Sequence, residues 1–296
     1  MSLVINHNLM AMNASRNLGT AFGNLSTSVR RLSSGLRVGT AADDAAGLAV
    51  RELMRSDIAS LNQGVRNAND AISLIQTADG ALSIIDEKLI RMKELAEQAA
   101  TGTYNSVQRL IIDSEYQAMA SEITRIANAT DFNGIYLLNG NLSSTTHDGS
   151  ALNSTGKLKV HFGVGNDSSE DYYYIQINTA TASALGLGNQ SAADAGYSIS
   201  TQQAAQQSLD AINQAIISKD KIRAALGALQ NRLENTISNL QIQAENLQAA
   251  ESQISDVDVA TEMTEFTRQQ ILTQAAVAML SQANSLPQMA LTLIGG

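Results

Sequence analysis

The amino-acid sequence predicts a mainly α-helical protein, a long antiparallel coiled-coil rod formed by both chain ends with a small β-hairpin region in the middle. Three observations predict this fold. Apolar residues recur at steps of three and four toward both ends of the chain. Turn signals with β-branched and aromatic residues gather between 131 and 187. Aromatic residues are only 4% of the 296 residues and proline occurs once, which favours long helices that touch along narrow seams.

The first predicted helix spans residues 3–36. Its apolar residues follow alternating steps of four and three, which is the spacing of a coiled coil. An ordinary amphipathic helix that packs on a core would show a similar pattern. The heptad set consists of Leu18, Phe22, Leu25, Val29, Leu32 and Leu36.

Residues 33–50 predict a bend or an ordered loop. Glycines interrupt the helical pattern here, and Asp43 and Asp44 offer turn and helix-capping chemistry. The paired carboxylates could also suggest a metal or acid–base site. No third ligand lies nearby in the sequence, so we expect the capping role.

Two further helices are predicted before the middle of the chain. The second spans 57–99, about 60 Å at 1.5 Å per residue, and Gly80 weakens it without ending it. Glu87 and Arg91 are spaced for a supporting ion pair. A break at 101–104 leads to a third, antiparallel helix over 106–128. Its apolar residues are Val107, Leu110, Ile111, Met119, Ile123 and Ile126.

The middle of the chain predicts short strands and loops. Two Asn-Gly pairs occur in 131–140, and this dipeptide favours hairpin turns. Segments 157–165 and 172–180 are predicted strands around a polar turn. Small polar residues dominate 139–156 and 186–200, as in exposed loops. Helical periodicity resumes at Leu209 and predicts one very long helix to the C-terminus.

Composition and motifs argue against several functions. The net charge of −9 disfavours duplex nucleic acid as a partner, and the absence of cysteine excludes disulfides and thiolate metal sites. No apolar run is long enough to insert into a membrane, and the N-terminus lacks the pattern of a cleaved signal peptide. His7, His147 and His161 are isolated. We therefore expect no enzyme, no metal and no cofactor.

The two chain ends carry opposite charge. Residues 1–56 hold six arginines and three acidic residues, whereas residues 245–296 hold one arginine and six acidic residues. Opposite charge favours contact between the ends, within one chain or between chains.

Four segments resemble bacterial flagellins. RLSSGLRVGTAADDAAGLAV (31–50) and RNANDAISLIQTADGAL (66–82) are similar to the N-terminal region of that family, and DFNGIYLLNG (131–140) to the segment that enters its β region. Residues 252–294 resemble the C-terminal region. The short stretch between the two regions implies a short form that lacks separate outer variable domains.

The resemblance implies a domain organisation. Residues 1–45 and 254–296 would form a terminal coiled-coil core layer, which we expect to be disordered in the monomer because its apolar stripes lack partners. Residues 46–130 and 200–253 would form an α-helical rod layer, with residues 131–199 as its β-hairpin and loop region.

The resemblance also implies a function. The protein would be a structural subunit that is exported unfolded and polymerises into the extracellular flagellar filament for motility. Its implied partners are further copies of itself, a flagellar export chaperone, and the filament cap and hook–filament junction proteins.

Two sets of residues are expected to carry these contacts. The filament-assembly set is Leu18, Phe22, Leu25, Val29, Leu32, Leu36, Phe266, Ile271, Leu272, Leu280, Leu286 and Leu291. The export-chaperone set is Met279, Leu280, Leu286, Met289 and Leu291.

The family is also recognised by a toll-like receptor of the host. The matching motif here is LIRMKELAEQ (89–98), which places the receptor-binding residues at Leu89, Arg91 and Leu95, with an acidic residue of the third helix at Glu115. Ile90, Lys93 and Glu97 depart from the family motif. A solvated ion pair of Arg91 with Glu87 is the alternative interpretation.

Other classes of protein fit less well. A hook–filament junction protein shares the terminal architecture and is the main alternative. A secreted coiled-coil tip or translocator protein would usually carry a long apolar segment, which is absent here. A flagellin with an inserted protease is excluded by the short middle segment and the missing zinc motif.

Overall fold

The computed structural model describes residues 8–188 and 197–294, and only the backbone of residues 286–288 and 290–294. The chain forms two compact units, one of residues 1–58 and 245–296 and one of residues 59–244. The boundaries between them fall inside the second and fourth helices. The described helices are α1 (Leu9–Ser34), α2 (Ala45–Ala100), α3 (Ser106–Ala129), α4 (Gln202–Ser255) and α5 (Val259–Ile294). The predicted mainly helical fold is confirmed.

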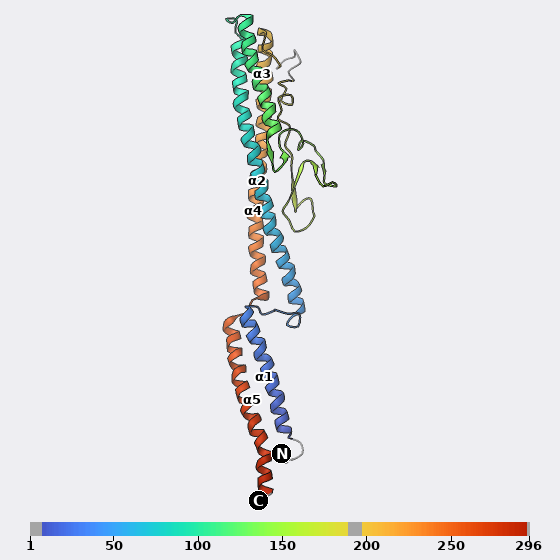
Figure 1. The fold of residues 1–296 in the computed structure, drawn as a ribbon, viewed down its shortest axis with the longest axis vertical. Coiled ribbons are helices and arrows are strands. Elements are labelled where there is room, and N and C mark those ends of the chain that lie inside the picture. The colour runs from blue at the N-terminus through green and yellow to red at the C-terminus, as the bar shows by residue number, and fades with distance from the viewer. Residues whose placement is uncertain (1–7, 189–196, 295–296) are drawn as a thin grey trace. The chain divides into compact units, whose positions relative to one another are not determined.

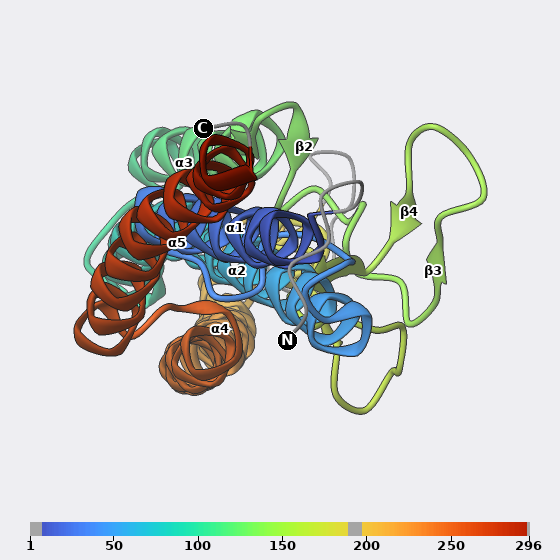
Figure 2. The same ribbon diagram turned by 90° about the horizontal axis from the view of Figure 1, so that it is seen from below.

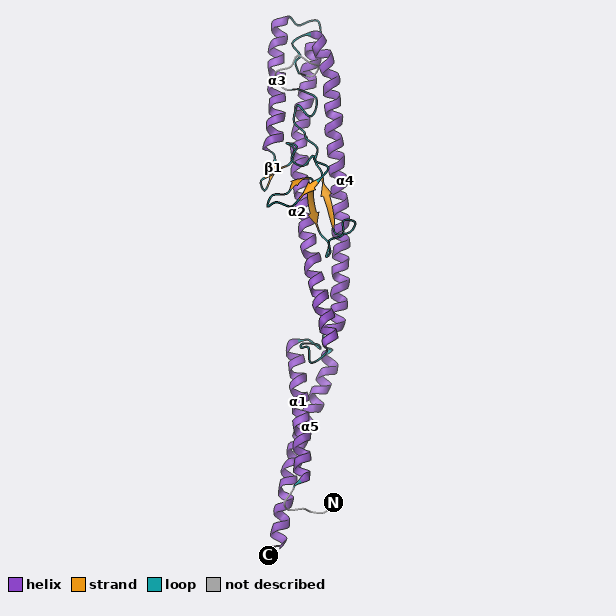
Figure 3. Ribbon diagram, turned by 90° about the vertical axis from the view of Figure 1, so that its right-hand side faces the viewer, coloured by secondary structure: helices purple, strands orange, loops and turns teal. Residues whose placement is uncertain are grey.

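The terminal unit pairs the first and last helices, which run side by side (Figures 1 and 3). The Asn8 side chain caps α1 by accepting a hydrogen bond from the Ala11 N–H at 3.1 Å. The same side chain donates to the Ala283 carbonyl of α5 at 2.7 Å. At its other end α1 stops at Gly35, whose φ of 72° is left-handed and suits glycine. One cap therefore both starts the helix and joins it to its partner.

The predicted single C-terminal helix is two helices, which corrects the sequence interpretation. α4 ends at Ser255 and α5 begins at Val259. Asp258 caps α5, because its carboxylate accepts a hydrogen bond from the Ala260 N–H at 2.9 Å. Hydrogen bonds from the Thr261 side chain and then from backbone amides hold the pKa of Asp258 below its ordinary value. The apolar periodicity continues across this break, so periodicity alone conceals it.

The loop at 35–44 confirms the predicted bend, and of its two aspartates Asp44 caps a helix whereas Asp43 stabilises the loop itself. The Thr40 N–H donates to Asp43 at 3.0 Å, and the Gly47 N–H donates to Asp44 at 2.9 Å. The hydroxyl of Thr40, followed by its amide and Arg30, lowers the pKa of Asp43. Because Asp44 caps α2, this helix starts at Ala45, twelve residues before the predicted 57.

The core of the second unit follows a heptad along α2. The helix passes through Gly80 without a break, as predicted. Ten side chains at alternating steps of three and four are almost fully buried, which is the packing of a coiled coil. They are Ala68, Ala71, Ile75, Ala78, Leu82, Ile85, Leu89, Met92, Ala96 and Ala99.

Helix α3 turns a different face to the core from the one its first apolar residues predict. Val107, Leu110 and Ile111 are exposed, whereas Ile112 and Tyr116 are buried. The Arg109 guanidinium reaches back to donate to the carbonyls of Ala99 and Thr101 at 3.0 and 2.9 Å, which ties the start of α3 to the end of α2. The helix is also fixed by a capping box between Asn105 and Gln108.

Helix α4 lies antiparallel to α2 within this unit, and polar contacts set their alignment. Asp79 pairs with Arg223 at 2.7 Å, and Asp86 pairs with Lys219 at 2.5 Å. Lys219 occupies a heptad position between buried Ala215 and Ile222, with only 2% of its surface exposed. A lysine at a core position of a coiled coil favours one register over the alternatives.

Among the described residues, three two-stranded antiparallel hairpins form the β region. The first confirms the hairpin predicted at the first Asn-Gly pair, with Asn133 and Gly134 at φ of 52° and 80°. The second Asn-Gly pair, at 139–140, connects no strands. The strands are β1 (Asp131–Phe132), β2 (Ile135–Tyr136), β3 (His147–Asp148), β4 (Thr155–Gly156), β5 (Leu158–His161) and β6 (Tyr172–Ile175).

The hairpins differ in how they meet the helices. β5 and β6 match the predicted strands, and the ring of Tyr173 lies 3.5 Å from the Arg232 guanidinium of α4. The β3–β4 hairpin falls in a segment predicted as loop, because its small polar residues conceal two-residue strands. Figure 2 shows it standing away from the helices of this unit.

Candidate functional site

The strongest candidate site is the surface of the α1–α5 pair. Large apolar side chains project from both helices, although a packed core would normally cover them. Those that are exposed on α1 and α5 are Leu9, Met10, Met12, Phe22, Val29, Val259, Met263, Ile271, Leu272, Val277, Met279 and Met289. On α5 they point in several directions around the helix, so one partner helix can cover only some of them.

The seam between the two helices uses small residues. Ala21 and Ser28 of α1 are buried, and Ala283 of α5 is buried opposite this helix. Small side chains allow the two backbones to approach closely. Ala21 and Ser28 each lie one residue before Phe22 and Val29 of the predicted heptad, whereas Leu18, Leu25 and Leu32 of that heptad are half-buried.

The predicted assembly residues therefore divide into two groups. Leu18, Leu25, Leu32, Leu36, Phe266 and Leu280 are half-buried along the pair. Phe22, Val29, Ile271 and Leu272 are exposed, with 63% of Phe22 accessible. The side chains of Leu286 and Leu291 lie outside the described residues. Sequence reasoning missed Ala21, Ser28 and Ala283, which the spacing of Ala14, Ala21 and Ser28 by seven residues could have indicated.

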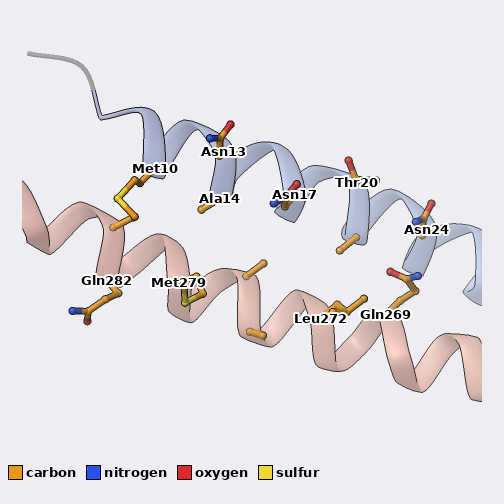
Figure 4. A pocket seen from close by; sticks show the side chains of 14 residues that line it. Met10, Asn13, Ala14, Asn17, Thr20, Asn24, Gln269, Leu272, Met279 and Gln282 are labelled. Carbon is orange, nitrogen blue, oxygen red and sulfur yellow. The ribbon is translucent and has the colours of Figure 1, made fainter. Parts of the chain in front are cut away.

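A groove of about 690 Å³ runs between α1 and α5 (Figure 4). Its walls are uncharged. Asparagine, glutamine and threonine side chains line it together with alanines, and Met10 and Met279 are the two methionines in its wall. Such a groove offers an apolar floor and amide hydrogen-bonding groups, without a fixed charge.

Arginines hold the segments that follow α1 and precede α5. Arg37 donates through its guanidinium to the Ile254 carbonyl at 2.6 Å, and Arg31 lies 3.7 Å from Glu262. Buried Arg51 donates to the Val38 carbonyl at 2.7 Å. The Arg31 and Arg37 contacts join the N-terminal region to the C-terminal region within one chain, and the pair of Arg31 with Glu262 unites the opposite charges of the two ends. The Arg51 contact fixes the start of α2 to the preceding loop.

The predicted receptor-binding residues lie in the second unit and divide by burial. Arg91 is exposed and bonds to Glu115 at 2.8 Å and to Glu94 at 2.9 Å. Hydrogen bonds with Glu94 and then Glu115 raise the pKa of Arg91. The predicted pairing of Arg91 with Glu87 is replaced by these two, because Glu115 of α3 faces the guanidinium across the helix pair.

Leu89 and Leu95 require a correction. Their exposed fractions are 0% and 2%, so they belong to the core of the second unit and offer no surface to a receptor. Leu89 occupies a heptad position of α2, and the apolar periodicity of the sequence already included it. Any direct contact at this place must use Arg91, Glu115 and their exposed neighbours.

The described residues hold no candidate metal centre. No group of three histidine, aspartate or glutamate side chains lies close enough to bind a metal within 8–188 and 197–294. Across the same ranges, the helices lack a segment long and apolar enough to cross a membrane. The paired ends, the heptad core and the small hairpins define a mainly helical protein whose first and last helices pair.

Comparison with known proteins gives the family. The model described as the bacterial flagellin N-terminal helical region matches residues 5–143, and that of the bacterial flagellin C-terminal helical region matches 209–294. This chain belongs to the bacterial flagellin family and is a structural component of the bacterial flagellum.

Relatives match along their whole length. A flagellar filament 33 kDa core protein of Treponema phagedenis is 41% identical over 295 residues, covering 99% of this chain and 100% of that protein. A flagellin of Halalkalibacterium halodurans is 42% identical over 292 residues, with 99% and 100% covered. A flagellar hook-associated protein from Vibrio parahaemolyticus, at 14% identity, shares the fold with a TM-score of 0.56 over 72% of this chain and 100% of that chain. The expected short form is therefore confirmed.

Proposed function

We propose that this chain polymerises into the flagellar filament through the α1–α5 pair, without catalytic activity. The exposed apolar side chains of this pair carry the proposal, because two helices cannot cover a surface that extends around α5. Neighbouring copies supply the missing cover. A contact between different faces of identical subunits does not close on itself and generates a helical fibre.

The same surface supports ordering on assembly. Apart from the seam of small residues, few apolar contacts join α1 to α5. The two helices are therefore stabilised mainly by neighbouring subunits. In the isolated subunit these segments fray, and they fold when they are packed between copies. The second unit, with its buried heptad core, folds without a partner.

Polymerisation from seeds tests this function. Purified protein is mixed with filament fragments and followed by electron microscopy, sedimentation and far-UV circular dichroism. We expect filaments together with a rise in helix content. Soluble, fully helical monomers that never elongate seeds would contradict the proposal.

A single substitution locates the contact. Phe22→Asp places a charge at an exposed apolar position of α1, and we expect the critical concentration for polymerisation to rise about tenfold or more. Ser238→Asp, at an exposed polar position of α4, is the matched control and should polymerise like the wild type. Equal behaviour of the two variants would place the contact elsewhere.

Export in an unfolded state with a chaperone on the C-terminal segment follows from the same surface. Met279 and Met289 are exposed and Leu280 is half-buried, while Leu286 and Leu291 lie beyond the described side chains. A chaperone that covers these residues keeps subunits from polymerising inside the cell. Removal of residues 276–296 should abolish binding of the flagellar export chaperone. Undiminished binding would overturn this assignment. Cap and junction proteins would contact the same terminal helices at the filament ends.

Recognition by the toll-like receptor rests on Arg91 and Glu115. The pair is exposed and joins α2 to α3. We expect Arg91→Ala and Glu115→Ala each to reduce receptor signalling, with the helix content of the second unit unchanged by circular dichroism. Lys221→Ala, at an exposed position of α4, is the control. Leu95→Ala is unsuitable because it opens a cavity in the core. Full signalling by both variants would contradict the proposal.

A hook–filament junction protein is the alternative function. It would use the same helical fold. The similarity of this chain to a hook-associated protein concerns the fold only. The two functions separate in the polymerisation experiment. A filament subunit elongates seeds indefinitely, whereas a junction protein adds a limited layer and stops.

A further inference from the structure

We propose that the exposed methionines of α1 and α5 are sites of reversible oxidation to the sulfoxide, and that this modification blocks polymerisation. The inference rests on the proposed function, in which these side chains are buried between subunits. It adds a chemical state of the monomer that decides whether it can assemble.

The distribution of methionines carries the inference. Of the eight methionines among the described residues, Met10, Met12, Met263, Met279 and Met289 are exposed, and all five lie on α1 or α5. Met54 and Met119, on α2 and α3, are half-buried. Their exposed fractions run from 46% to 63%. Met92, in the heptad core of α2, is fully buried at 0%. Thioether sulfur is therefore concentrated on the surface that assembly requires.

These methionines are also the preferred targets of a two-electron oxidant there. The chain has no cysteine and no tryptophan, and the segments 8–58 and 245–294 contain no tyrosine or histidine. A peroxide therefore meets thioethers before any other easily oxidised side chain. Sulfur attacks one peroxide oxygen, and the S–O bond forms as the O–O bond breaks. The hydrogen of the attacked oxygen passes to the second oxygen, which leaves as water. Sulfur loses two electrons, and hydrogen peroxide is the oxidant that gains them.

The groove shows why an oxidised subunit would persist as a monomer. Met10 of α1 and Met279 of α5 both line it, and Figure 4 shows Met10 reaching towards α5. Asn13 of α1 and Gln282 of α5 also line the groove, but Figure 4 shows their amide ends turned away from Met10. Because Met10 and Met279 are exposed, water can donate to a sulfoxide oxygen within one subunit.

Polymerisation removes that solvation. A methionine that packs against an apolar surface of a neighbour is flexible and adapts to it, whereas a sulfoxide is polar and must keep a hydrogen-bond donor. A buried sulfoxide oxygen without a donor opposes association. One such group is expected to raise the critical concentration about tenfold, and several together to prevent filament formation.

Assembly protects the same sites. Side chains buried between copies are shielded from peroxide, so oxidation acts on monomers and leaves finished filaments intact. Enzymatic reduction of the sulfoxide restores the thioether and returns the subunit to the polymerising pool.

The experiment uses the full chain and hydrogen peroxide. Monomer and preformed filaments are treated in parallel, the peroxide is removed with catalase, and sulfoxides are mapped by peptide mass spectrometry. We expect sulfoxide at the five exposed methionines of the monomer, protection of these residues in filaments, and no modification of Met92. Equal oxidation of Met92 or of filaments would overturn the proposal.

Polymerisation of the treated monomer from seeds is then measured before and after treatment with methionine sulfoxide reductases A and B. We expect the critical concentration to rise about tenfold or more and to return on reduction. In a variant with leucine at the five positions, each sample is compared with its own untreated protein, and peroxide should change it less than twofold. An oxidised wild type that polymerises normally, or one that reductase does not rescue, would contradict the inference. Untreated protein that never elongates seeds would instead refute the proposed function, and the inference with it.

Discussion

Leu36 and Asp256, from opposite ends of the chain, face each other in an antiparallel β-bridge. Two backbone hydrogen bonds flank it, from the Arg37 N–H to the Ser255 carbonyl at 2.6 Å and from the Val257 N–H to the Gly35 carbonyl at 3.0 Å. The bridge lies where α1 ends and just before α5 begins. It fixes the two terminal helices at a common starting point for their seam.

Removing one donor tests the bridge. Val257→Pro removes the N–H that donates to the Gly35 carbonyl. We expect the stability of the terminal unit to fall by about 1 kcal/mol or more and the critical concentration for polymerisation to rise about fivefold. Val257→Ala keeps the donor and should have a smaller effect. Sedimentation after seeding measures both. Equal effects of the two variants would show that the side chain matters and the bridge does not.

A second prediction concerns the close approach of α2 to the β5–β6 hairpin. A Cβ added at Gly64 would lie 2.0 Å from the Phe162 carbonyl oxygen. Gly64→Ala should therefore destabilise the second unit by about 1–3 kcal/mol. Gly80→Ala, which meets nothing within 4 Å, should stabilise it by about 0.5–1 kcal/mol. Urea unfolding measures both, and a stabilising Gly64→Ala would contradict the packing.

A third prediction concerns Lys219. Its ammonium contacts Asp86 at 2.5 Å and Asp220 at 2.7 Å inside the seam of α2 and α4. Lys219→Ala leaves a cavity and removes the partner of Asp86, which is partly solvated. We therefore expect the free energy of unfolding, measured in urea, to fall by about 2–4 kcal/mol.

Two further variants separate charge from packing at this position. Lys219→Met combined with Asp86→Ala should recover most of the stability, because an apolar side chain can replace a buried ion pair. Lys221→Ala, on the exposed side of α4, should change stability by less than about 0.5 kcal/mol. A double variant as unstable as Lys219→Ala would show that the ion pair itself is required.

A fourth prediction is a loss of stability at alkaline pH. Burial, with a smaller contribution from Asp113, raises the pKa of Tyr116, which is fully buried in the core of the second unit. The unfolded chain ionises this phenol near pH 10, before the folded chain does. The stability from neutral Tyr116 is therefore complete below about pH 10 and decreases above it.

Tyrosine-to-phenylalanine variants measure this contribution. Tyr116→Phe should cost about 1 kcal/mol at pH 7, because a buried hydroxyl loses its hydrogen bond, and should flatten the decline above pH 10 in urea unfolding. Tyr136→Phe, at an exposed ring, should keep the wild-type pH dependence. If the stability of Tyr116→Phe still falls above pH 10 as in the wild type, other groups cause the alkaline loss of stability.

Large and small side chains differed in how well their burial could be predicted. The apolar stripe of α2 was predictable because large side chains at heptad spacing have few other uses. The α1–α5 seam was harder to predict, because Ala21 and Ser28 are small and carry little hydrophobic signal. The prediction favoured Phe22, the larger side chain one position further on, which is exposed.

Breaks and burial were the least predictable features. Asp258 ends one helix and caps the next, and the apolar period continues through it. Val107 and Ile111 of α3 are exposed, although their apolar side chains predicted burial, because the helix packs through Ile112 and Tyr116 instead. Among the receptor residues, motif spacing identified Arg91 and Leu95 together, although only Arg91 is exposed.

The sequence by itself determined the helical class, the pairing of the chain ends, the hairpin at Asn133 and Gly134, and the flagellin family. These follow from period, turn chemistry and motif order, which are local properties of the chain. The tertiary structure decided which face of each helix is buried, where α4 gives way to α5, and that Leu89 and Leu95 are core residues. These depend on contacts between distant segments, whose geometry no local pattern specifies.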